Sequence, residues 1–371
     1  MDLLPVRPSS KRDFFVLVAV FITLAVFLHN PFLAHIQRRR AVSSLPSLVS
    51  KINNSTLGFE KIFVIGLPSR TDRRDGMLLQ AALSDMDLEF IDGVPGGDVP
   101  DKAIPKTSEH DRLGNGAIGC WRGHMNALAE IVCRNLTSVF ILEDDVNWDI
   151  RLRYQLHDFA LSTQALMQPL ADAPFSFVDP TYPISRMSEG SPGRIPDIPF
   201  EHLPAIIPPR TSPYGDDWDL LWIGHCGMHF PFEDTENVPK ARIIHANDVT
   251  VAPKDLWTFN IPFTLKESYP EHTRAVHHAQ EGVCTLGYAV SQQGARRLLH
   301  EVALKDVGDA PALFHHHRAA GPMSSMSDIG NHGDGFRETA MTDMVRWSVR
   351  LNADALLEGR TDFFDQYPDD K

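Results

Sequence analysis

The chain has 371 residues, enough for two ordinary domains or one large one. Apolar residues make up 43% of it and charged residues 22%, which supports a sizeable core and excludes wholesale disorder. With 35 Lys and Arg against 48 Asp and Glu, the net charge is −13. We expect no nucleic-acid partner, because sequence-independent binding of nucleic acid requires a basic surface. Four cysteines in this length exclude a small disulfide-framework protein.

One long apolar run lies near the N-terminus. Residues 14–28 read FFVLVAVFITLAVFL, and the run can be extended to residue 34. It is apolar on every face, and no A-x-A-like cleavage site follows it. It therefore predicts an uncleaved transmembrane signal-anchor over residues 14–34, after a short tail of residues 1–13, with a cleaved signal peptide as the alternative. Basic residues flank it on both sides, so charge alone leaves its orientation open.

Residues 35–58 predict a polar stem. Asn53 and Asn54 each begin an N-x-[ST] sequon there, and Asn135 begins a third. Sequons beside an anchor favour a glycoprotein whose C-terminal domain, residues 59–371, lies in the lumen. The pattern predicts a single-pass type II membrane protein of the Golgi or endoplasmic reticulum.

Short apolar runs alternate with helical patterns after the stem. Residues 61–67, 88–91 and 139–142 predict buried strands, and residues 72–86 and 118–134 predict helices. This alternation predicts an α/β fold with a parallel sheet.

The second half of the chain is less regular. Eleven prolines between residues 169 and 213 predict a long irregular insertion. Beyond it, strands are predicted at residues 216–224, 242–245 and 284–290, and helices at 295–302 and 339–351.

The cysteine positions limit any disulfide pairing. Cys120 and Cys133 share one predicted helix, which would separate them by about 20 Å. Any bridge must therefore involve Cys226 or Cys284, and free buried thiols are the alternative.

The strongest chemical signal is Glu143-Asp144-Asp145 at the end of a predicted buried strand. Three adjacent carboxylates at such a place are unfavourable unless they are paired or bind a cation. In extended chain, Glu143 and Asp145 would project to one side and Asp144 to the other. Carboxylate oxygens in this arrangement suit Mg²⁺ or Mn²⁺ together with phosphate. The alternative is an acidic turn that caps the next helix through Asp149.

Three further features are weaker signals of function than the acidic motif when each is taken alone. Arg70, Arg73 and Arg74 follow the first strand and are placed to pair with phosphates, although a solvated helix turn is equally typical. Residues 114–119 match G-x-G-x-x-G, but no strand is predicted before them, so we expect no Rossmann dinucleotide site. His124 lies beside the apolar stripe of its helix, as a core histidine would.

Five segments together resemble glycosyltransferase family 25, the lipooligosaccharide and procollagen galactosyltransferase group. In the family's order they are IFVIGLPSRTDRRD (62–75), FIDGV (90–94), GNGAIGCWRGHMNAL (114–128), VFILEDDV (139–146) and TLGYAVSQQGARRLL (285–299). The proline-rich insertion looks like that of a eukaryotic, fungal-type member. Gly123 departs from the family's Ser. The stretch near residues 303–313 is short for the family, with Asp306 and Asp309 as the only candidates for its acidic residue.

The resemblance implies a GT-A-like, Rossmann-type mixed or parallel sheet flanked by helices. It implies a hexosyltransferase that uses a nucleotide-sugar donor such as UDP-galactose, a glycan or glycoprotein acceptor, and Mn²⁺ or Mg²⁺. A catalytically inactive sugar- or nucleotide-binding protein of the secretory pathway is the alternative. Carried over by position, the implied site residues are Leu67, Arg70, Arg73 and Gly119 for the nucleotide sugar, Glu143 and Asp145 for the metal, and Asp144 and His124 for catalysis.

Overall fold

The computed structural model describes residues 48–104, 113–182, 197–235, 238–257, 262–301, 314–318, 321–322, 335–342 and 345–369. All of them belong to one compact unit, Leu48–Lys371. The predicted transmembrane segment lies outside the described residues. Within those ranges, no helix combines the length and the apolar character that crossing a membrane requires.

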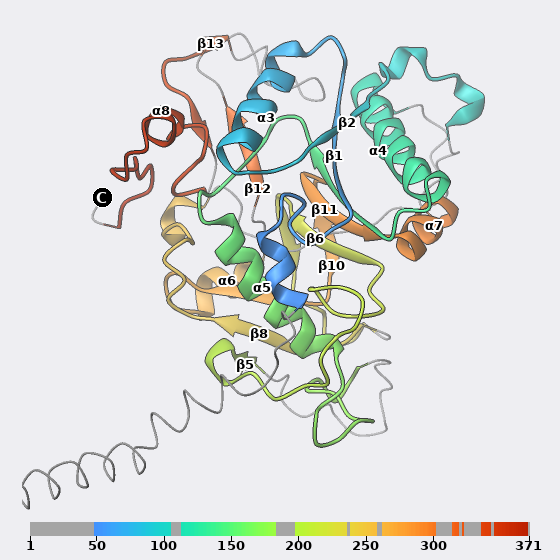
Figure 1. Ribbon diagram of the computed structural model, residues 1–371, viewed down its shortest axis with the longest axis vertical. Helices are drawn as coiled ribbons and strands as arrows, with labels where there is room; N and C mark the ends of the chain where they lie inside the picture. Colours follow the sequence, from blue (N-terminus) through green and yellow to red (C-terminus); the bar gives the residue numbers. More distant parts are fainter. Residues whose placement is uncertain are drawn as a thin grey trace, which may run out of the picture. The chain divides into compact units, whose positions relative to one another are not determined.

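A mixed five-stranded sheet, in the order β2-β1-β3-β11-β6, forms the centre of the described part (Figure 1). Strands β1 (Lys61–Gly66), β2 (Glu89–Asp92) and β3 (Ser138–Glu143) are parallel. Strand β11 (Gly287–Ser291) is antiparallel to β3 and to β6 (Leu220–Gly224). The predicted α/β class is confirmed, but the sheet is mixed because β11 enters it in the reverse direction.

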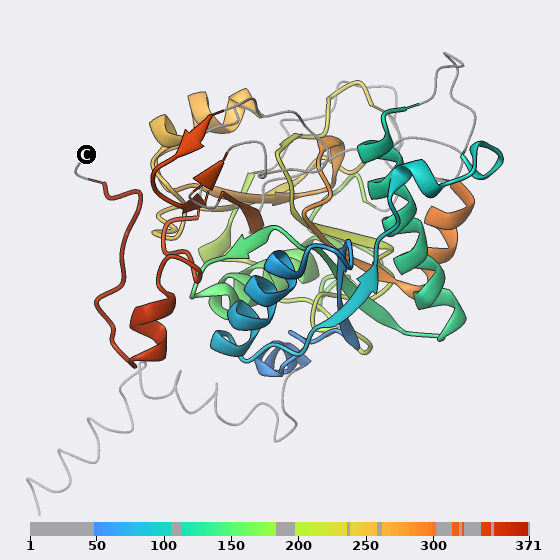
Figure 2. The ribbon, with the colours of Figure 1, turned by 90° about the horizontal axis from the view of Figure 1, so that it is seen from above.

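Helices cover both faces of this sheet, which explains why β1 and β3 are apolar along most of their length. Ile62 and Val64 of β1 pack in one core with α3 (Thr71–Leu83) and α5 (Leu152–Met167). The alternate residues Phe63 and Ile65 pack in a second core with α4 (Asn115–Cys133) and α7 (Gln292–Glu301). Helices α4 and α7 lie side by side at one side of the sheet (Figure 2). A strand buried on both faces has no polar alternation.

Helices α3 and α4 end in the same way, and both ends differ by one to three residues from the sequence expectation. Asp85 and Asn135 follow the last turns in the left-handed region, at φ 51° and 56°. In α3, the next amide, Met86 N, donates to Ala81 O at 2.9 Å, which closes a Schellman motif. Helix α3 therefore ends at Leu83 rather than at residue 86.

The predicted helix over residues 339–351 is wrong. Met341–Thr342 forms strand β15, turns follow, and the next helix is α8 (Ala353–Leu357). The reason is a buried polar network: Asn147 Nδ2 donates to Thr342 Oγ1 at 2.8 Å and also to Ser348 Oγ. Backbone groups of this segment also bond outside it: Gln366 Nε2 donates to Thr342 O at 2.7 Å, and Val349 N donates to Trp148 O at 3.1 Å.

The proline-rich region contributes one short strand to a second sheet. Strand β5 (Asp197–Pro199) lies at the edge of the sheet β5-β8-β9, parallel to β8 (Arg242–His245), where a proline is tolerated. Ile198 and Phe200 pack against α5 in a small core of their own. The described part of the insertion is thus largely irregular but packed against the rest of the unit.

The remaining elements surround these layers. The other strands are β4 (Val146–Trp148), β7 (Gly227–His229), β9 (Arg274–His277), β10 (Gln280–Val283), β12 (Phe314–Arg318), β13 (Gly321–Pro322) and β14 (Phe336–Arg337). The short helices are α6 (Phe263–Ser268), η1 (Leu48–Asn53), η2 (Gly96–Asp98), η3 (Asp101–Ala103), η4 (Phe200–His202) and η5 (Lys254–Leu256).

One disulfide joins Cys226, before β7, to Cys284, before β11, with a Cα–Cα distance of 5.5 Å. This confirms the prediction that a bridge involves Cys226 or Cys284, and the structure shows that it joins the two to each other. Cys120 and Cys133 are free thiols.

Candidate functional site

A pocket of about 480 Å³ opens at the carboxyl ends of the parallel strands. Its walls are the ends of β1 and β3, the residues that follow β2, and the first turns of α4. Ligands of α/β proteins bind at this edge of the sheet, because loops there are free to vary while the strands hold them in place.

The structure brings seven of the eight predicted site residues together. Those lining the pocket are Leu67, Arg73, Gly119, His124, Glu143, Asp144 and Asp145. Arg70 is not part of the lining, and its guanidinium pairs with Asp72 at 2.8 Å. Asp149, the alternative helix cap, lies apart from the pocket lining and accepts a hydrogen bond from Arg151 N at the start of α5.

Arg73 joins two of the three adjacent carboxylates. Its guanidinium donates to Asp144 Oδ1 at 2.6 Å and lies 3.3 Å from Asp145 Oδ2. The expected alternation of side chains is wrong here: β3 ends at Glu143, and the two aspartates occupy the turn after it. Asp144 and Asp145 therefore share one cationic partner, while Glu143 takes part in a different set of contacts.

Asp144 is the most enclosed of the three carboxylates. Its side chain lies over Gly66, where a Cβ atom would collide with it. Burial raises the pKa of Asp144 to about 6, although the Arg73 guanidinium acts in the opposite direction. A carboxyl group with such a pKa can both accept and release a proton near neutral pH.

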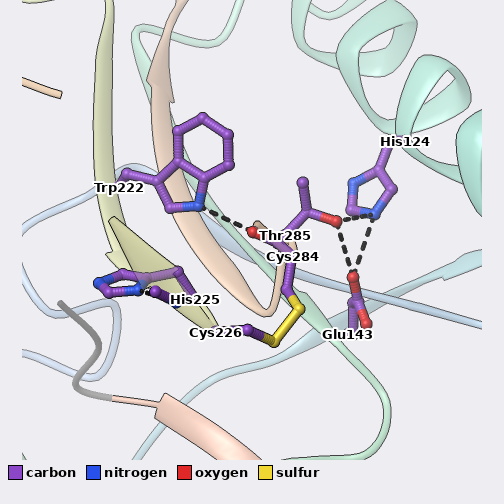
Figure 3. Close-up of a disulfide and its surroundings, with 8 residues drawn as sticks. His124, Glu143, Trp222, His225, Cys226, Cys284 and Thr285 are labelled. Carbon is purple, nitrogen blue, oxygen red and sulfur yellow. Dashed lines mark hydrogen bonds and ion pairs between the residues drawn. A yellow bond between two sulfur atoms is a disulfide. The ribbon is translucent and has the colours of Figure 1, made fainter. Parts of the chain in front are cut away.

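Glu143 is held by a hydrogen-bonded chain of side chains (Figure 3). Thr285 Oγ1 donates to Glu143 Oε1 at 2.7 Å and lies 3.1 Å from His124 Nε2. On the other side of the imidazole, His124 Nδ1 lies 2.9 Å from the Tyr288 hydroxyl. His124 Nε2 is also 3.5 Å from Glu143 Oε1.

These contacts determine which ring nitrogen of His124 carries a hydrogen. The Thr285 hydroxyl has one hydrogen and directs it to Glu143, so His124 Nε2 must carry a hydrogen and donate to Thr285. Burial alone would lower the pKa of His124, but its contacts with Tyr288, Cys120 and Glu143 together raise that pKa well above its usual value. Burial also raises the pKa of Tyr288.

Glycines bring the backbone of α4 close to its neighbours. A Cβ atom on Gly119 would lie 2.8 Å from Val94 O and 3.1 Å from Gly96 N, so only glycine fits against the wall of the pocket. A Cβ atom on Gly123 would lie 2.8 Å from Ile65 Cγ2. Gly123, the departure from the family pattern, thus lets α4 pack closely on β1.

Two donor sets in the pocket could hold a cation. The carboxylates of Glu143, Asp144 and Asp145, which all line the pocket, offer oxygen alone and suit Mg²⁺ or Mn²⁺. Cys120, His124 and Glu143 offer sulfur, nitrogen and oxygen, and among the described residues their ligand atoms all lie within 4.8 Å of one another. A mixed set of that kind suits a softer ion such as Zn²⁺.

Sequence reasoning missed three residues at this site. Thr285 and Tyr288 belong to a segment that resembles the family, but they read as ordinary strand residues. Arg350 was placed in a helix that does not form. Burial lowers the pKa of Arg350 to about 10, and its charge interacts with Asp145 and Asp144. Such long-range contacts leave no local pattern in the sequence.

Comparisons with known proteins match part of this chain to one family. Residues 59–179, which include β1, α4 and the acidic motif, match the family model "Glycosyltransferase family 25 (LPS biosynthesis protein)". The human protein named "Inactive glycosyltransferase 25 family member 3" is 32% identical over 115 residues, covering 28% of this chain and 19% of that protein. "Procollagen galactosyltransferase 1" of Danio rerio is 29% identical over 153 residues, covering 38% of this chain and 24% of that protein.

A third relative, "Procollagen galactosyltransferase 2" of Mus musculus, is 24% identical over 183 residues, covering 46% of this chain and 27% of that protein. The chain therefore spans about a quarter of the length of the relatives it matches. Their names include both galactosyltransferases and an inactive member. Through residues 59–179, this chain is similar to glycosyltransferase family 25.

Proposed function

We propose that this chain is a metal-assisted hexosyltransferase. It transfers a hexose, with galactose the first candidate, from a nucleotide sugar such as UDP-galactose to a hydroxyl of a glycan or glycoprotein. The observation that carries the proposal is that Arg73, three carboxylates and several glycines line one pocket at the carboxyl ends of β1 and β3. In this proposal the central sheet is GT-A-like.

The donor would bind between the glycine-lined wall and Arg73. Gly96 and Gly119 let the loop after β2 pack closely on α4, and the diphosphate would lie beside the first turns of that helix. Arg73 can bind phosphate oxygens through two parallel hydrogen bonds. Leu67 would contact the nucleoside, whereas Arg70 would act from outside the pocket lining.

The donor chemistry of the pocket fits a divalent cation. Asp144 and Asp145 already converge on one positive group, the Arg73 guanidinium, so the site accommodates positive charge between oxygen atoms. Glu143 and Asp145 would hold Mn²⁺ or Mg²⁺, with Asp144 beside them. When bound, the cation supplies charge that offsets the negative charge on the departing nucleoside diphosphate.

Asp144 and His124 would have different roles. His124 keeps a hydrogen on Nε2 and has a raised pKa, so it stabilises negative charge instead of accepting a proton. Asp144, with a pKa of about 6, is the better acceptor for the proton of the attacking hydroxyl. A nucleotide- or sugar-binding protein without turnover is the second candidate, because a relative with 32% identity is named inactive.

Turnover on a panel of nucleotide sugars tests the proposal. The full chain is incubated with MnCl₂ and each donor, and release of the nucleoside diphosphate is measured. We expect hydrolysis or transfer with at least one donor, and loss of it with EDTA or in Asp145→Ala. Binding of a donor with no turnover under any condition would favour the second candidate.

We further propose that the protein is a single-pass membrane protein, anchored by residues 14–34, with its domain in the lumen of the Golgi or endoplasmic reticulum. The disulfide supports an oxidising compartment. Asn53, Asn54 and Asn135 are all exposed and so accessible to glycan transfer. Glycosidase treatment should increase gel mobility, and the C-terminal domain should resist protease until vesicles are permeabilised. Digestion in intact vesicles would contradict this topology.

A further inference from the structure

We infer that Thr285 is a positioning residue of the pocket and that the Cys226–Cys284 disulfide braces it. The inference rests on the proposed function and adds to it a residue outside the pocket lining and outside residues 59–179. Thr285 holds Glu143 and His124 in their relative orientation, and the disulfide holds Thr285.

The Thr285 hydroxyl forms hydrogen bonds with both Glu143 and His124. It donates its one hydrogen to Glu143 Oε1 at 2.7 Å and accepts from His124 Nε2 at 3.1 Å. Without it, Glu143 and His124 retain a 3.5 Å contact, which is too long for a good hydrogen bond. The hydroxyl thereby sets the direction in which the Glu143 carboxylate faces the pocket.

The backbone beside Thr285 is fixed from several sides. Cys284 has φ 76°, in the left-handed region that disfavours residues with a side chain. Its sulfur is bonded to Cys226, and its carbonyl oxygen accepts a hydrogen bond from Trp222 Nε1 at 3.1 Å (Figure 3). Cys226 N also donates to Val283 O at 2.8 Å. A strained residue persists only where its surroundings enforce it.

The same segment is tied to the acidic motif through the backbone. Glu143 N donates to Leu286 O at 3.1 Å, so the chain on both sides of Thr285 is attached, by the disulfide before it and by β3 after it. The backbone of Thr285 is thereby held in place beside Glu143. This arrangement explains why the bridge lies directly before the residue that makes both contacts.

Three variants of the full chain separate positioning from packing. Thr285→Val removes the hydroxyl but keeps the shape, and Thr285→Ser restores the hydroxyl. Thr163→Val is the matched control: Thr163 is a buried threonine of α5 whose hydroxyl bonds to Ala160 O at 3.0 Å, away from this pocket. All three are first compared by thermal unfolding, to confirm that they fold.

Donor hydrolysis with MnCl₂ is then measured for kcat and KM. We expect Thr285→Val to lower kcat roughly 10- to 100-fold, since the lost hydrogen bond is to a charged group, with KM nearly unchanged because Thr285 does not line the pocket. Thr285→Ser should recover most of the turnover, and Thr163→Val should match the wild type. Unchanged kcat in Thr285→Val, or an equal loss in Thr285→Ser, would overturn the inference.

The role of the disulfide in holding Thr285 is tested with Cys226→Ser, alone and together with Thr285→Val. If the disulfide acts through Thr285, the double variant should lose no more kcat than the more impaired single variant. Losses that multiply would show that the bridge and the hydroxyl act separately, and would overturn the bracing role.

An NMR measurement keeps the inference testable if the wild type turns over no donor, a result that would refute the proposed function alone. The imidazole signal of His124 is assigned with His124→Gln in histidine-labelled protein. It should move in Thr285→Val and return in Thr285→Ser, while Thr163→Val leaves it in place. A His124 signal that is unaffected by loss of the hydroxyl would contradict the positioning role.

Discussion

Replacing Asp144 by Asn should stabilise the metal-free protein at neutral pH, although it removes an ion pair. The pKa of Asp144 is about 6 in the folded protein, against 3.8 for an ordinary Asp side chain. Burial is the main cause, and the opposing effect of Arg73 is already contained in that value. The ionised carboxylate is therefore less favourable in the folded protein than in the unfolded chain.

The sign and size of the change in the free energy of unfolding follow from proton linkage. Between about pH 4 and pH 6 the folded state binds this proton more tightly than the unfolded chain, so stability falls as the pH rises through that window. A shift of about two pKa units corresponds to about 3 kcal/mol, fully expressed above pH 6 and absent below the ordinary pKa. Asp144→Asn, which mimics the neutral form, should recover up to that amount at pH 7.5.

The assay is urea unfolding in EDTA at pH 7.5 and pH 4, with Asp248→Asn as the matched control. Asp248 is as buried as Asp144, at 6% against 4% exposure, and pairs with Arg274 at 2.7 Å. Burial would raise the pKa of Asp248, but Arg274 and Thr250 outweigh it and hold that pKa well below its usual range. The contribution of the Asp248 carboxylate to stability is present above the ordinary pKa of Asp and is lost as the pH falls.

The two variants should thus change stability in opposite directions at pH 7.5. We expect Asp248→Asn to lower the free energy of unfolding by about 3–5 kcal/mol, because Arg274 loses its buried partner. Asp144→Asn should raise it, and its difference from the wild type should disappear near pH 4. If Asp144→Asn is destabilising at pH 7.5, the Asp144 carboxylate is a structural ion-pair partner and the reasoning about its burial is wrong.

Three further predictions concern the walls of the pocket and the disulfide before Thr285. Arg73→Ala should weaken binding of UDP with MnCl₂ about 10- to 100-fold by calorimetry, while Arg74→Ala, outside the pocket lining, should not; equal losses would indicate unspecific attraction. Gly119→Ala should lower the free energy of unfolding by about 1–3 kcal/mol, whereas Gly114→Ala, with open space around it, should have little effect in the same urea titration. Cys226→Ser should lower stability by about 2–4 kcal/mol, since the bridge closes a 58-residue separation; an unchanged melting temperature would refute this.

The central strands were predictable because their pattern is local. Strands β1 and β3 are short apolar runs between turn signals, and both faces of each are buried as expected. The acidic motif was predictable for the same reason, because three charges directly after a buried strand stand out. The directions of the side chains in the acidic motif were not predictable. They depend on where β3 ends and on Arg73, which lies 71 residues away in sequence from Asp144.

Other parts depend on contacts that no local pattern records. The helix expected over residues 339–351 competes with a buried network in which Thr342 bonds to Asn147, 195 residues away. Thr285 reaches Glu143 across 142 residues, and only the folded sheet places β11 beside β3. Periodicity and turn chemistry identify elements, but they do not identify which polar side chains meet.

The most direct test of the proposed function is a crystal structure of the protein with UDP and MnCl₂. We expect the diphosphate in the pocket between Arg73 and the glycine-lined wall at Gly96 and Gly119, with Mn²⁺ beside Glu143 and Asp145. UDP bound at any other place on the chain, or a pocket that stays empty at millimolar UDP and MnCl₂, would contradict it.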